Sequence, residues 1–294
     1  MTVRDIAFLG TGLMGAPMVR RMLGAGLAVR VWNRSPAKTA ALEADGAAVA
    51  ASAGNAAAGA AAVCLCLTDG DAVEEVLLGA DGIATRLAPG AVIVDFSTIG
   101  PQSTREIAAR LARVAPGVRW VDAPVTGGVR GAKSGELVIL CGGDAGDVAA
   151  VGDVLAPLAK RICHLGPLGS GQAAKLCNQL IVGVNVIAIA EALALGRAQG
   201  LDIAALPGAL AGGWADSLPL QIIGPRMAAN VSEPAIVSIG TYAKDLALVE
   251  DCGGGFGGAG GGLAAHALSL LRVALDEGLG ACDVTALLPF AERG

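Results

Sequence analysis

Aromatic side chains are scarce in this chain of 294 residues, at 3% of the total, and only two histidines occur, His164 and His266. Charges form no long runs: 21 basic and 26 acidic residues are interspersed, for a formal net charge of −5. Without a basic stripe the sequence argues against nucleic-acid binding. The two histidines have no ligand pattern around them, so we expect structural roles for both and no metal site.

Cysteine offers no framework either, since seven residues at irregular spacing fit neither a disulfide scaffold nor a metal site. Small buried thiols in a reducing cytoplasm are the simplest explanation. The first ten residues lack the charged start and apolar stretch of a signal peptide. An apolar run over 179–198 is interrupted by Gln179, Asn185 and Glu191, which are costly in hydrocarbon. We therefore expect a cytoplasmic protein without a membrane span, in which this run is a core or subunit-interface helix.

Small aliphatic residues dominate instead: apolar residues make up 54% of the chain, and there are 44 glycines. In the first half, short apolar runs alternate with helix-like segments, and strands are predicted at 3–9, 28–32, 61–67, 91–95, 118–122, 137–141 and 161–164. This alternation predicts an α/β fold with a mostly parallel, doubly wound sheet. From Leu201 the pattern is helical, at 201–211, 218–223, 240–252 and 263–277. The expected organisation is a sheet domain over 1–165, a long connecting helix over 166–198 and an all-α domain over 199–294.

A glycine-rich turn follows the first predicted strand and precedes a helix: Gly10-Thr11-Gly12-Leu13-Met14-Gly15. In that context the first glycine permits a tight turn, the second lets the backbone approach a pyrophosphate, and the third lets the helix pack on the strand. The amide groups at the start of the helix then face the phosphates. We predict a dinucleotide site made by these six residues.

The end of the second predicted strand indicates which dinucleotide binds. Enzymes that use NAD usually place an acidic residue there to hold the ribose hydroxyls, whereas this chain has Asn33-Arg34-Ser35. A guanidinium without a neighbouring acid favours a 2′-phosphate, so NADP is the predicted cofactor and NAD the alternative. An ordinary surface arginine is the competing explanation of Arg34. Leu67, Thr68, Ser97 and Thr98 follow two further strands and are expected at the same crevice.

One long, proline-free helix is predicted from Gly169 to Gly196, and it is apolar almost all the way round. Near its start it carries Lys175, with Asn178 three residues further on the same face. Two explanations stand: the lysine extends its head to water, or it lies in a cleft as proton donor to a substrate oxygen while the asparagine orients the substrate.

Three further segments are candidates for binding. Thr126-Gly127-Gly128 follows a strand with amides that can face an anion, or it is a plain turn. Trp214 lies in a loop as an apolar pocket wall or as core. Lys244 begins a helix beside Asp245, as a cofactor contact or as half of a solvated charged pair.

Together these stretches resemble the β-hydroxyacid dehydrogenase family, which includes 3-hydroxyisobutyrate dehydrogenase and tartronate semialdehyde reductase. The matching pieces run in family order: 8–18, 94–98, 122–128, 169–179 and 244–246. The resemblance implies a Rossmann-type first domain and a reaction between a small 3-hydroxyacid and its semialdehyde or keto acid. It also implies Lys175 as the catalytic acid and base, Asn178 and 126–128 as substrate contacts, and Thr98 and Lys244 as cofactor contacts. A cofactor and desolvation would both lower the pKa of such a lysine.

The form Lys-x-x-Asn-Gln followed by Asn185 is most similar to the tartronate semialdehyde reductases. An imine or ketone reductase, or a cofactor-binding module without turnover, remains an alternative on the same scaffold. The chain departs from the family in its glycine-rich stretch 253–262, where we expect a mobile loop or a weak helix end. A small carboxylate-bearing substrate and a homodimer or homotetramer are the expected partners, the latter because the apolar 179–198 helix needs further burial.

Overall fold

The structure is a computed structural model that describes residues 5–253 and 262–293. The chain divides into two compact units, Met1–Lys175 and Leu176–Gly294. Most of the glycine-rich stretch 253–262, for which the sequence predicts a mobile loop, lies outside the described residues.

The first unit is built on a parallel six-stranded sheet in the order β3-β2-β1-β4-β5-β6. Its strands are β1 (Asp5–Leu9), β2 (Ala28–Trp32), β3 (Ala48–Val49), β4 (Ala62–Leu65), β5 (Val92–Asp95) and β6 (Arg119–Asp122). Every residue of β4 and β5 is buried, because helices cover both faces of a doubly wound sheet. The predicted α/β fold class is confirmed.

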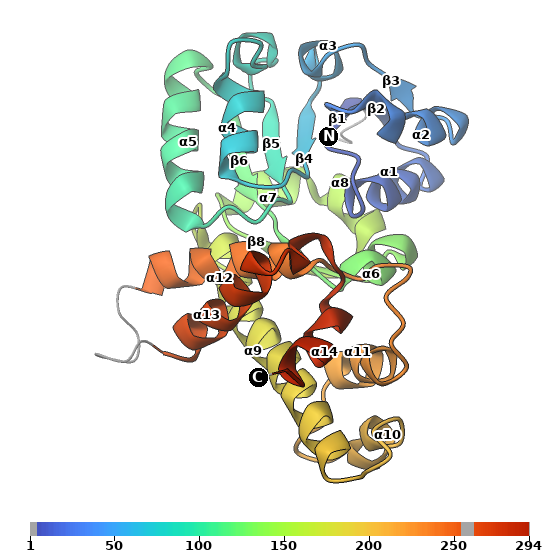
Figure 1. Ribbon diagram of the computed structural model, residues 1–294. Coiled ribbons are helices and arrows are strands. Elements are labelled where there is room, and N and C mark those ends of the chain that lie inside the picture. The colour runs from blue at the N-terminus through green and yellow to red at the C-terminus, as the bar shows by residue number, and fades with distance from the viewer. Residues whose placement is uncertain (1–4, 254–261, 294) are drawn as a thin grey trace. The chain divides into compact units, whose positions relative to one another are not determined.

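Successive residues of β1, a strand labelled in Figure 1, alternate between two separate hydrophobic cores. Ile6 and Phe8 join one core with Met18 of α1 (Gly15–Gly24), whereas Ala7 and Leu9 join the other. The second core contains Leu77 of α4 (Gly70–Leu78) and residues of α5 (Pro101–Val114). The helices after β1 and β4 therefore pack on opposite faces, which makes the gap between these two strands the topological switch point.

Three later strands form a second sheet: β7 (Val125–Thr126), β8 (Leu137–Cys141) and β9 (Ala159–His164). The pair β7–β8 is antiparallel and β8–β9 is parallel. Strands at 137–141 and 161–164 are thus correctly located but do not extend the main sheet, because periodicity identifies a strand without identifying its neighbour. A bridge between Asp122 and Gly142 links the two sheets.

Short helices complete this unit: α2 (Ala40–Ala44), α3 (Ala53–Ala57), α6 (Gly128–Ser134), α7 (Ala145–Ala150), α8 (Gly152–Leu155), and 3-10 turns at Pro36–Lys38, Ala84–Arg86 and Ala156–Leu158. The single helix expected over 145–158 is divided in two at Val151. Glycine at 152 and Pro157 both weaken a continuous helix there.

The long helix α9 (Ser170–Ala198) begins in the first unit and continues through the second. It is long and apolar enough to cross a membrane, and 39% of its most apolar stretch is buried. In the second unit its buried face packs with α12 (Ile239–Gly253) and α13 (Leu263–Asp276) through Leu193, Leu246 and Leu271. The remaining elements are α10 (Leu206–Leu210), α11 (Leu218–Ala228), α14 (Leu287–Ala291) and 3-10 turns at Leu279–Ala281 and Val284–Ala286.

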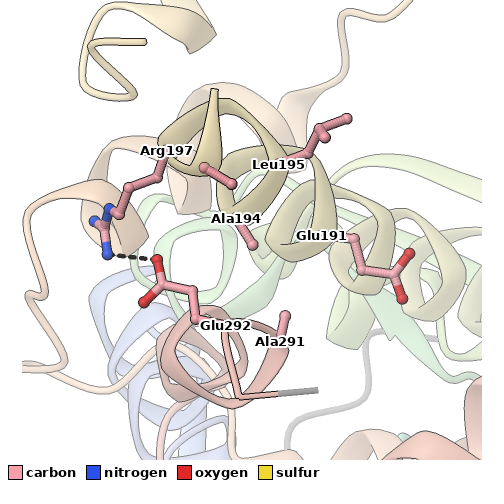
Figure 2. Close-up of a pocket in the computed structure, with 7 residues that line it drawn as sticks. Glu191, Ala194, Leu195, Arg197, Ala291 and Glu292 are labelled. Carbon is pink, nitrogen blue, oxygen red and sulfur yellow. Dashed lines mark hydrogen bonds and ion pairs between the residues drawn. The ribbon is translucent and has the colours of Figure 1, made fainter. Parts of the chain in front are cut away.

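In the second unit, one helix is shorter than predicted, and a hollow that the sequence did not predict borders α9. The helix predicted over 201–211 is shorter, since Pro207 fits only its first turn and Gly212 has a positive φ of 74°. A hollow lies where α9 meets the end of α14, bordered by Leu195 and closed on one side by an ion pair between Arg197 and Glu292 (Figure 2).

Candidate active site

The glycine-rich turn lies at the switch point between β1 and β4. Gly10 has φ +100°, and a Cβ there would overlap the Cys66 carbonyl oxygen, while a Cβ at Gly15 would overlap the Gly10 carbonyl oxygen. Gly12 differs, because a Cβ at that position would meet no atom of the chain within 4 Å. Packing therefore explains Gly10 and Gly15, whereas the openness at Gly12 leaves room for a ligand to approach the backbone.

The neighbouring residues of the turn are fixed by hydrogen bonds. The Thr11 N–H donates to Asn33 Oδ1 at 3.1 Å, and the Thr11 hydroxyl donates to the Lys38 carbonyl at 3.1 Å. The Asn33 amide in turn donates to the Ser35 carbonyl at 3.1 Å. Asn33 thus joins the end of β2 to the turn, which leaves Arg34 as an exposed cation beside it. Leu13 is also exposed, at 69%, and Met14 is half-buried.

The ends of β4 and β5 are held together at the same edge of the sheet. The Leu67 N–H donates to Ser97 Oγ at 3.0 Å, and the Ser97 N–H donates to Asp95 Oδ1 at 2.9 Å. Thr68 is exposed and Thr98 is half-buried. The structure thereby brings these residues of the predicted crevice next to Gly10, whose Cβ position is 2.9 Å from a Leu67 methyl group.

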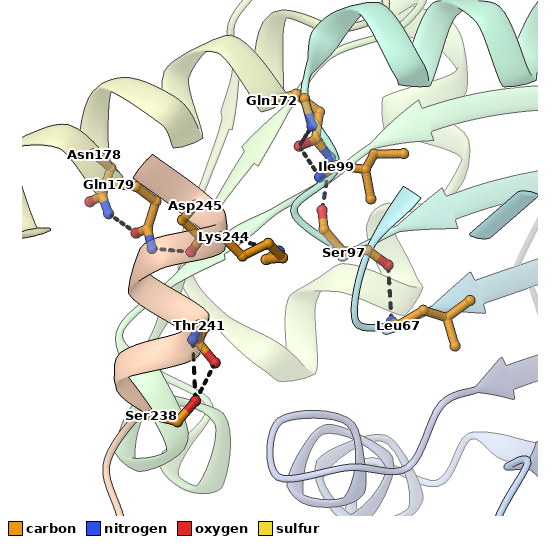
Figure 3. Close-up of polar contacts among 11 residues, drawn as sticks. Leu67, Ser97, Ile99, Gln172, Asn178, Gln179, Ser238, Thr241, Lys244 and Asp245 are labelled. Carbon is orange, nitrogen blue, oxygen red and sulfur yellow. Dashed lines mark hydrogen bonds and ion pairs between the residues drawn. The ribbon is translucent and has the colours of Figure 1, made fainter. Parts of the chain in front are cut away.

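The start of α9 is anchored to these strand ends by two buried side chains that sequence reasoning did not select, Gln172 and Asp122. The Gln172 amide donates to the Ser97 carbonyl at 2.8 Å, and its oxygen accepts from the N–H groups of Ile99 at 3.1 Å and Gly100 at 3.3 Å (Figure 3). Both Gln172 and Asp122 are fully buried. For Gln172, the only signal in the sequence was its position as a polar residue in the first turn of an apolar helix.

Asp122, the last residue of β6, caps α9. Its carboxylate accepts from the Gly169 N–H at 2.7 Å and from the Gln172 N–H at 2.8 Å. A carboxylate at a helix N-terminus satisfies amides that have no partner within the helix. Burial raises the pKa of this carboxyl above its ordinary value, although the backbone hydrogen bonds act in the opposite direction.

Lys175 lies one turn beyond Gln172 on the same side of α9 and is buried, with 9% of its surface exposed. An extended chain with its ammonium in open water would leave more of the side chain exposed, so burial argues against the solvent-directed explanation. The position of Lys175 is set by the anchored first turn, because Gln172 and Asp122 fix that turn to the carboxyl ends of β5 and β6.

The segment Thr126-Gly127-Gly128 ends the short strand β7 and begins α6. Both glycines have positive φ, 122° and 61°, and both are exposed. A Cβ at Gly128 would meet nothing within 4 Å. As at Gly12, the backbone here is open to a ligand, and two consecutive residues in this conformation favour glycine.

In the second unit, a chain of polar contacts connects Asn178 with Lys244 (Figure 3). The Asn178 amide donates to Gln179 Oε1 at 2.8 Å, and the Gln179 amide donates to Asp245 Oδ2 at 2.5 Å. Lys244 completes the chain through an ion pair of 2.9 Å with Asp245, which is buried. The charged pair is therefore tied to α9 and is not simply solvated. The hydrogen bond between Gln179 and Asp245 was not predicted, since the two residues are 66 positions apart in the chain.

The Trp214 loop is braced by two polar residues. Asp216 accepts from the Gly212 N–H and from the Gln221 amide, each at 2.7 Å, and these bonds lower the pKa of its carboxyl. The Ser217 hydroxyl donates to Asn185 Oδ1 of α9 at 2.8 Å. Trp214 itself is fully exposed, which excludes the explanation that it fills the core of its own unit.

These features fit a dinucleotide. The openness at Gly12, the buried ends of β1 and β4 and the exposed guanidinium of Arg34 form one edge of the first unit. Within this unit the structure brings the predicted residues 10–15, 33–35, 67, 68 and 98 to that edge, together with the anchored helix start at Lys175. Asn178, Trp214 and Lys244 belong to the second unit.

Comparison with known proteins agrees with this arrangement. Residues 5–166 match the family model for the NAD-binding domain of 6-phosphogluconate dehydrogenase, and residues 169–291 match that for NADP-dependent 3-hydroxyisobutyrate dehydrogenase. In Pseudomonas aeruginosa, 3-hydroxyisobutyrate dehydrogenase is 39% identical over 83% of each chain, and NAD-dependent L-serine dehydrogenase is 34% identical over 97% of each.

A solved structure of 3-hydroxyisobutyrate dehydrogenase from Mycobacterium tuberculosis with L-serine has a TM-score of 0.83 and 33% identity, covering 97% of this chain and 98% of the other. The fold, both family models and full-length relatives thus agree. The chain belongs to the β-hydroxyacid dehydrogenase family and is an NAD(P)-binding oxidoreductase.

Proposed function

We propose that the chain is an NADP-preferring oxidoreductase that interconverts a small 3-hydroxyacid and its semialdehyde or keto acid, with Lys175 as general acid and base. The observation that carries this proposal is a buried lysine one turn beyond Gln172, which anchors α9 to the strand ends at the dinucleotide edge. An ammonium in a dry site both stabilises and protonates an oxygen that gains negative charge.

When bound, the nicotinamide ring supplies or accepts the hydride. In oxidation the substrate C–H bond breaks with loss of hydride, and Lys175 Nζ, unprotonated at that stage, accepts the hydroxyl proton as the carbonyl forms. In reduction the charged Lys175 Nζ returns that proton to the oxygen. Gln172 and Asp122 hold the first turn of α9 in place throughout, so the lysine does not have to be ordered during the reaction.

The proposed substrate class follows from the binding groups and from what the relatives act on. Both 3-hydroxyisobutyrate and L-serine carry a hydroxyl on the carbon next to the one that bears the carboxylate. The open amides at Gly127 and Gly128 suit a carboxylate, and we assign Thr126 and Asn178 to the same task. Trp214 provides an apolar wall for the substrate.

The NADP preference depends on Arg34. It is exposed beside Asn33, whose side chain is engaged with Thr11 and Ser35, so the guanidinium is the group left to receive a 2′-phosphate. Lys244 and Thr98 are the proposed further cofactor contacts. The relative named as an L-serine dehydrogenase is NAD-dependent, so the cofactor preference of this chain has to be measured with both cofactors.

A substrate panel tests the proposal. The purified chain is assayed with NADPH and with NADH against tartronate semialdehyde, succinic semialdehyde, glyoxylate and a cyclic imine. We expect the highest kcat/KM with a semialdehyde and NADPH, and Arg34→Ala should reduce the NADPH advantage by about tenfold. Preference for NADH would overturn the cofactor assignment. Turnover of the cyclic imine alone would show that the chain is an imine reductase and does not act on semialdehydes. NADPH binding without turnover of any of these compounds would indicate a cofactor-binding module.

We also propose that the chain self-associates into a dimer or tetramer and resides in the cytoplasm. Self-association is supported by α9, since less than half of its most apolar stretch is buried within the chain. The cytoplasmic location is supported by the buried free thiols of Cys64 and Cys141, which suit a reducing environment.

A further inference from the structure

The loop that follows β2 is fixed to the glycine-rich turn at both of its ends. At its start, Asn33 Oδ1 accepts from the Thr11 N–H at 3.1 Å. At its end, the Lys38 carbonyl accepts from the Thr11 hydroxyl at 3.1 Å. Residues 34–37 lie between these two bonds and are all exposed. One residue of the turn, Thr11, therefore holds both ends of the loop 33–38.

Further hydrogen bonds within the loop keep it compact. The Asn33 amide donates to the Ser35 carbonyl at 3.1 Å, and the Lys38 N–H donates to the same carbonyl at 3.0 Å. The Thr39 hydroxyl donates to the Pro36 carbonyl at 2.8 Å, and Thr39 is buried. The loop is thus an ordered turn in its own right, and the bonds at its two ends set its position relative to the glycine-rich turn.

The Thr11 hydroxyl contributes a hydrogen bond that packing alone does not require. Thr11 is 2% exposed, so its side chain fills a closed space. Valine has the same shape as threonine, and in this space the hydroxyl differs from a methyl group by its bond to the Lys38 carbonyl. A net hydrogen bond of this kind changes an equilibrium by about 2- to 10-fold. The hydroxyl is therefore able to shift the position of the loop without being needed for the fold.

The position of the loop matters because it carries Arg34, on which the proposed NADP preference depends. A guanidinium binds a phosphate through two parallel N–H groups, so its affinity depends on orientation more than that of a point charge does. A fixed backbone also lowers the entropy that a flexible arginine loses on binding. Residues 30–42 contain no acidic side chain that could repel a 2′-phosphate. Within this segment, selectivity thus depends on where the guanidinium is held.

We propose that Thr11 is a positioning residue for cofactor selectivity, whose buried hydroxyl holds the loop 33–38 so that Arg34 receives the 2′-phosphate of NADP. This inference rests on the NADP preference proposed above and assigns part of it to a bond inside the protein. The bond from the Thr11 N–H to Asn33 belongs to the backbone and persists when the side chain is changed. The hydroxyl is therefore open to test by itself.

Three substitutions at Thr11 separate the hydroxyl from the rest of the side chain. Thr11→Val removes the hydroxyl at constant shape, Thr11→Ala removes it in a smaller residue, and Thr11→Ser keeps it. Thr104→Val is the matched control, because Thr104 is fully buried and its hydroxyl donates to the Gly100 carbonyl at 2.9 Å. Circular dichroism melts check that each variant is folded.

The quantity measured is the ratio of kcat/KM with NADPH to kcat/KM with NADH, for the semialdehyde that the wild type reduces best. A loss of activity common to both cofactors cancels in this ratio, so a merely structural change does not move it. Calorimetric titration with adenosine 2′,5′-bisphosphate and with adenosine 5′-monophosphate gives a second readout. These two probes differ by the 2′-phosphate and do not involve the catalytic step.

We expect Thr11→Val and Thr11→Ala to lower the NADPH-to-NADH ratio by about 3- to 10-fold, and Thr11→Ser and Thr104→Val to stay within about twofold of the wild type. The affinity for the bisphosphate relative to the monophosphate should follow the same order. In the Arg34→Ala background, Thr11→Val should cause no further loss, because no guanidinium is left to position.

An unchanged ratio in Thr11→Val, or an equal loss in Thr11→Ser, would overturn this inference. Additive losses in the double variant would overturn it too, since they would show that Thr11 does not act through Arg34. A wild type that prefers NADH would overturn the proposed cofactor together with this inference. A wild type that prefers NADPH, with the same ratio in Thr11→Val, would overturn this inference alone and leave the proposed function intact.

Discussion

The first turns of α9 and its later turns are opposites in the same helix. Residues 170–179 carry buried polar side chains, and Gln172 and Gln179 each make hydrogen bonds to segments distant in the chain. Residues 180–198 are almost entirely aliphatic, and one row of them is exposed. The difference shows that one apolar helix can have two roles. Its start positions Lys175, and its later turns expose an aliphatic surface.

The two parts also differ in what holds them. The start depends on directional bonds to Asp122, Ser97 and Ile99, each of which leaves an unpaired buried group when it is removed. The later turns depend on burial of side chains such as Leu193, which tolerate small movements better than hydrogen bonds do. Substitutions at the start should therefore affect turnover, and those further along should affect stability or assembly.

The largest effect is expected from Lys175→Ala. Removing the proton donor should lower kcat by about 10²- to 10⁴-fold while NADPH affinity stays close to that of the wild type. Steady-state kinetics with the best semialdehyde and a fluorescence titration with NADPH measure the two quantities. Near-normal turnover would refute the proposed role of Lys175, and loss of NADPH binding would mean that the change disturbed the fold.

Leu193 and Leu195 test the difference between the buried and the exposed face of the later turns of α9. Leu193 is fully buried, so Leu193→Ala should lower the free energy of unfolding by about 2–5 kcal/mol. Leu195 is 64% exposed in the single chain, so Leu195→Ala should change it by less than about 0.5 kcal/mol in a monomer. Urea unfolding at low protein concentration checks both. Equal effects would contradict the assignment of the two faces.

Gln172→Ala tests whether the anchored start matters for turnover. It leaves the buried N–H groups of Ile99 and Gly100 unpaired, and loosening of the first turn should lower kcat by about 10- to 100-fold with a smaller change in KM. Gln102→Ala is the matched control, because Gln102 donates to Glu106 on an exposed part of α5. A purely structural role would lower the melting temperature but leave kcat per folded molecule unchanged.

The smallest effect concerns pH. Burial raises the pKa of Asp122 in the folded state, so the folded chain binds this proton more readily than the unfolded chain does. The contribution of Asp122 to stability therefore rises as the pH falls through the raised pKa and is lost as the pH rises above it. The stability of the wild type minus that of Asp122→Asn, measured by urea unfolding from pH 7 downwards, should increase as the pH falls. A constant difference would contradict the shift.

Much of the fold was predictable, because strand and helix periodicity is local. The glycine turn at 10–15, the strand–helix alternation and the helix from Ser170 all follow from residues close in sequence. The second sheet was not predictable, since β8 has the composition of a main-sheet strand and only its pairing with β7 and β9 distinguishes it. Likewise, the sequence predicted that the apolar 179–198 helix needs further burial, but it did not identify which residues of α9 form the exposed row.

The candidate site divides in the same way. Lys175, Asn33 and Gly12 stand in local motifs, whereas Gln172 and Asp122 act through bonds that span between 47 and 75 residues. Hydrophobic patterning cannot rank one buried polar residue above another, because the partners are fixed only when distant strands meet. The roles given to the individual site residues remain predictions for the experiments above.

Because a side chain at Gly12 would meet no atom of the chain, selection for folding and selection for cofactor binding should give different results at this position. A library scored only by how much intact protein accumulates in cells should reject side chains at Gly10 and Gly15, which have no room, and accept alanine at Gly12. A library scored by growth on the enzyme's product should reject all three. Positions where the two scores disagree would trace the outline of the nucleotide on this protein without any bound ligand in view.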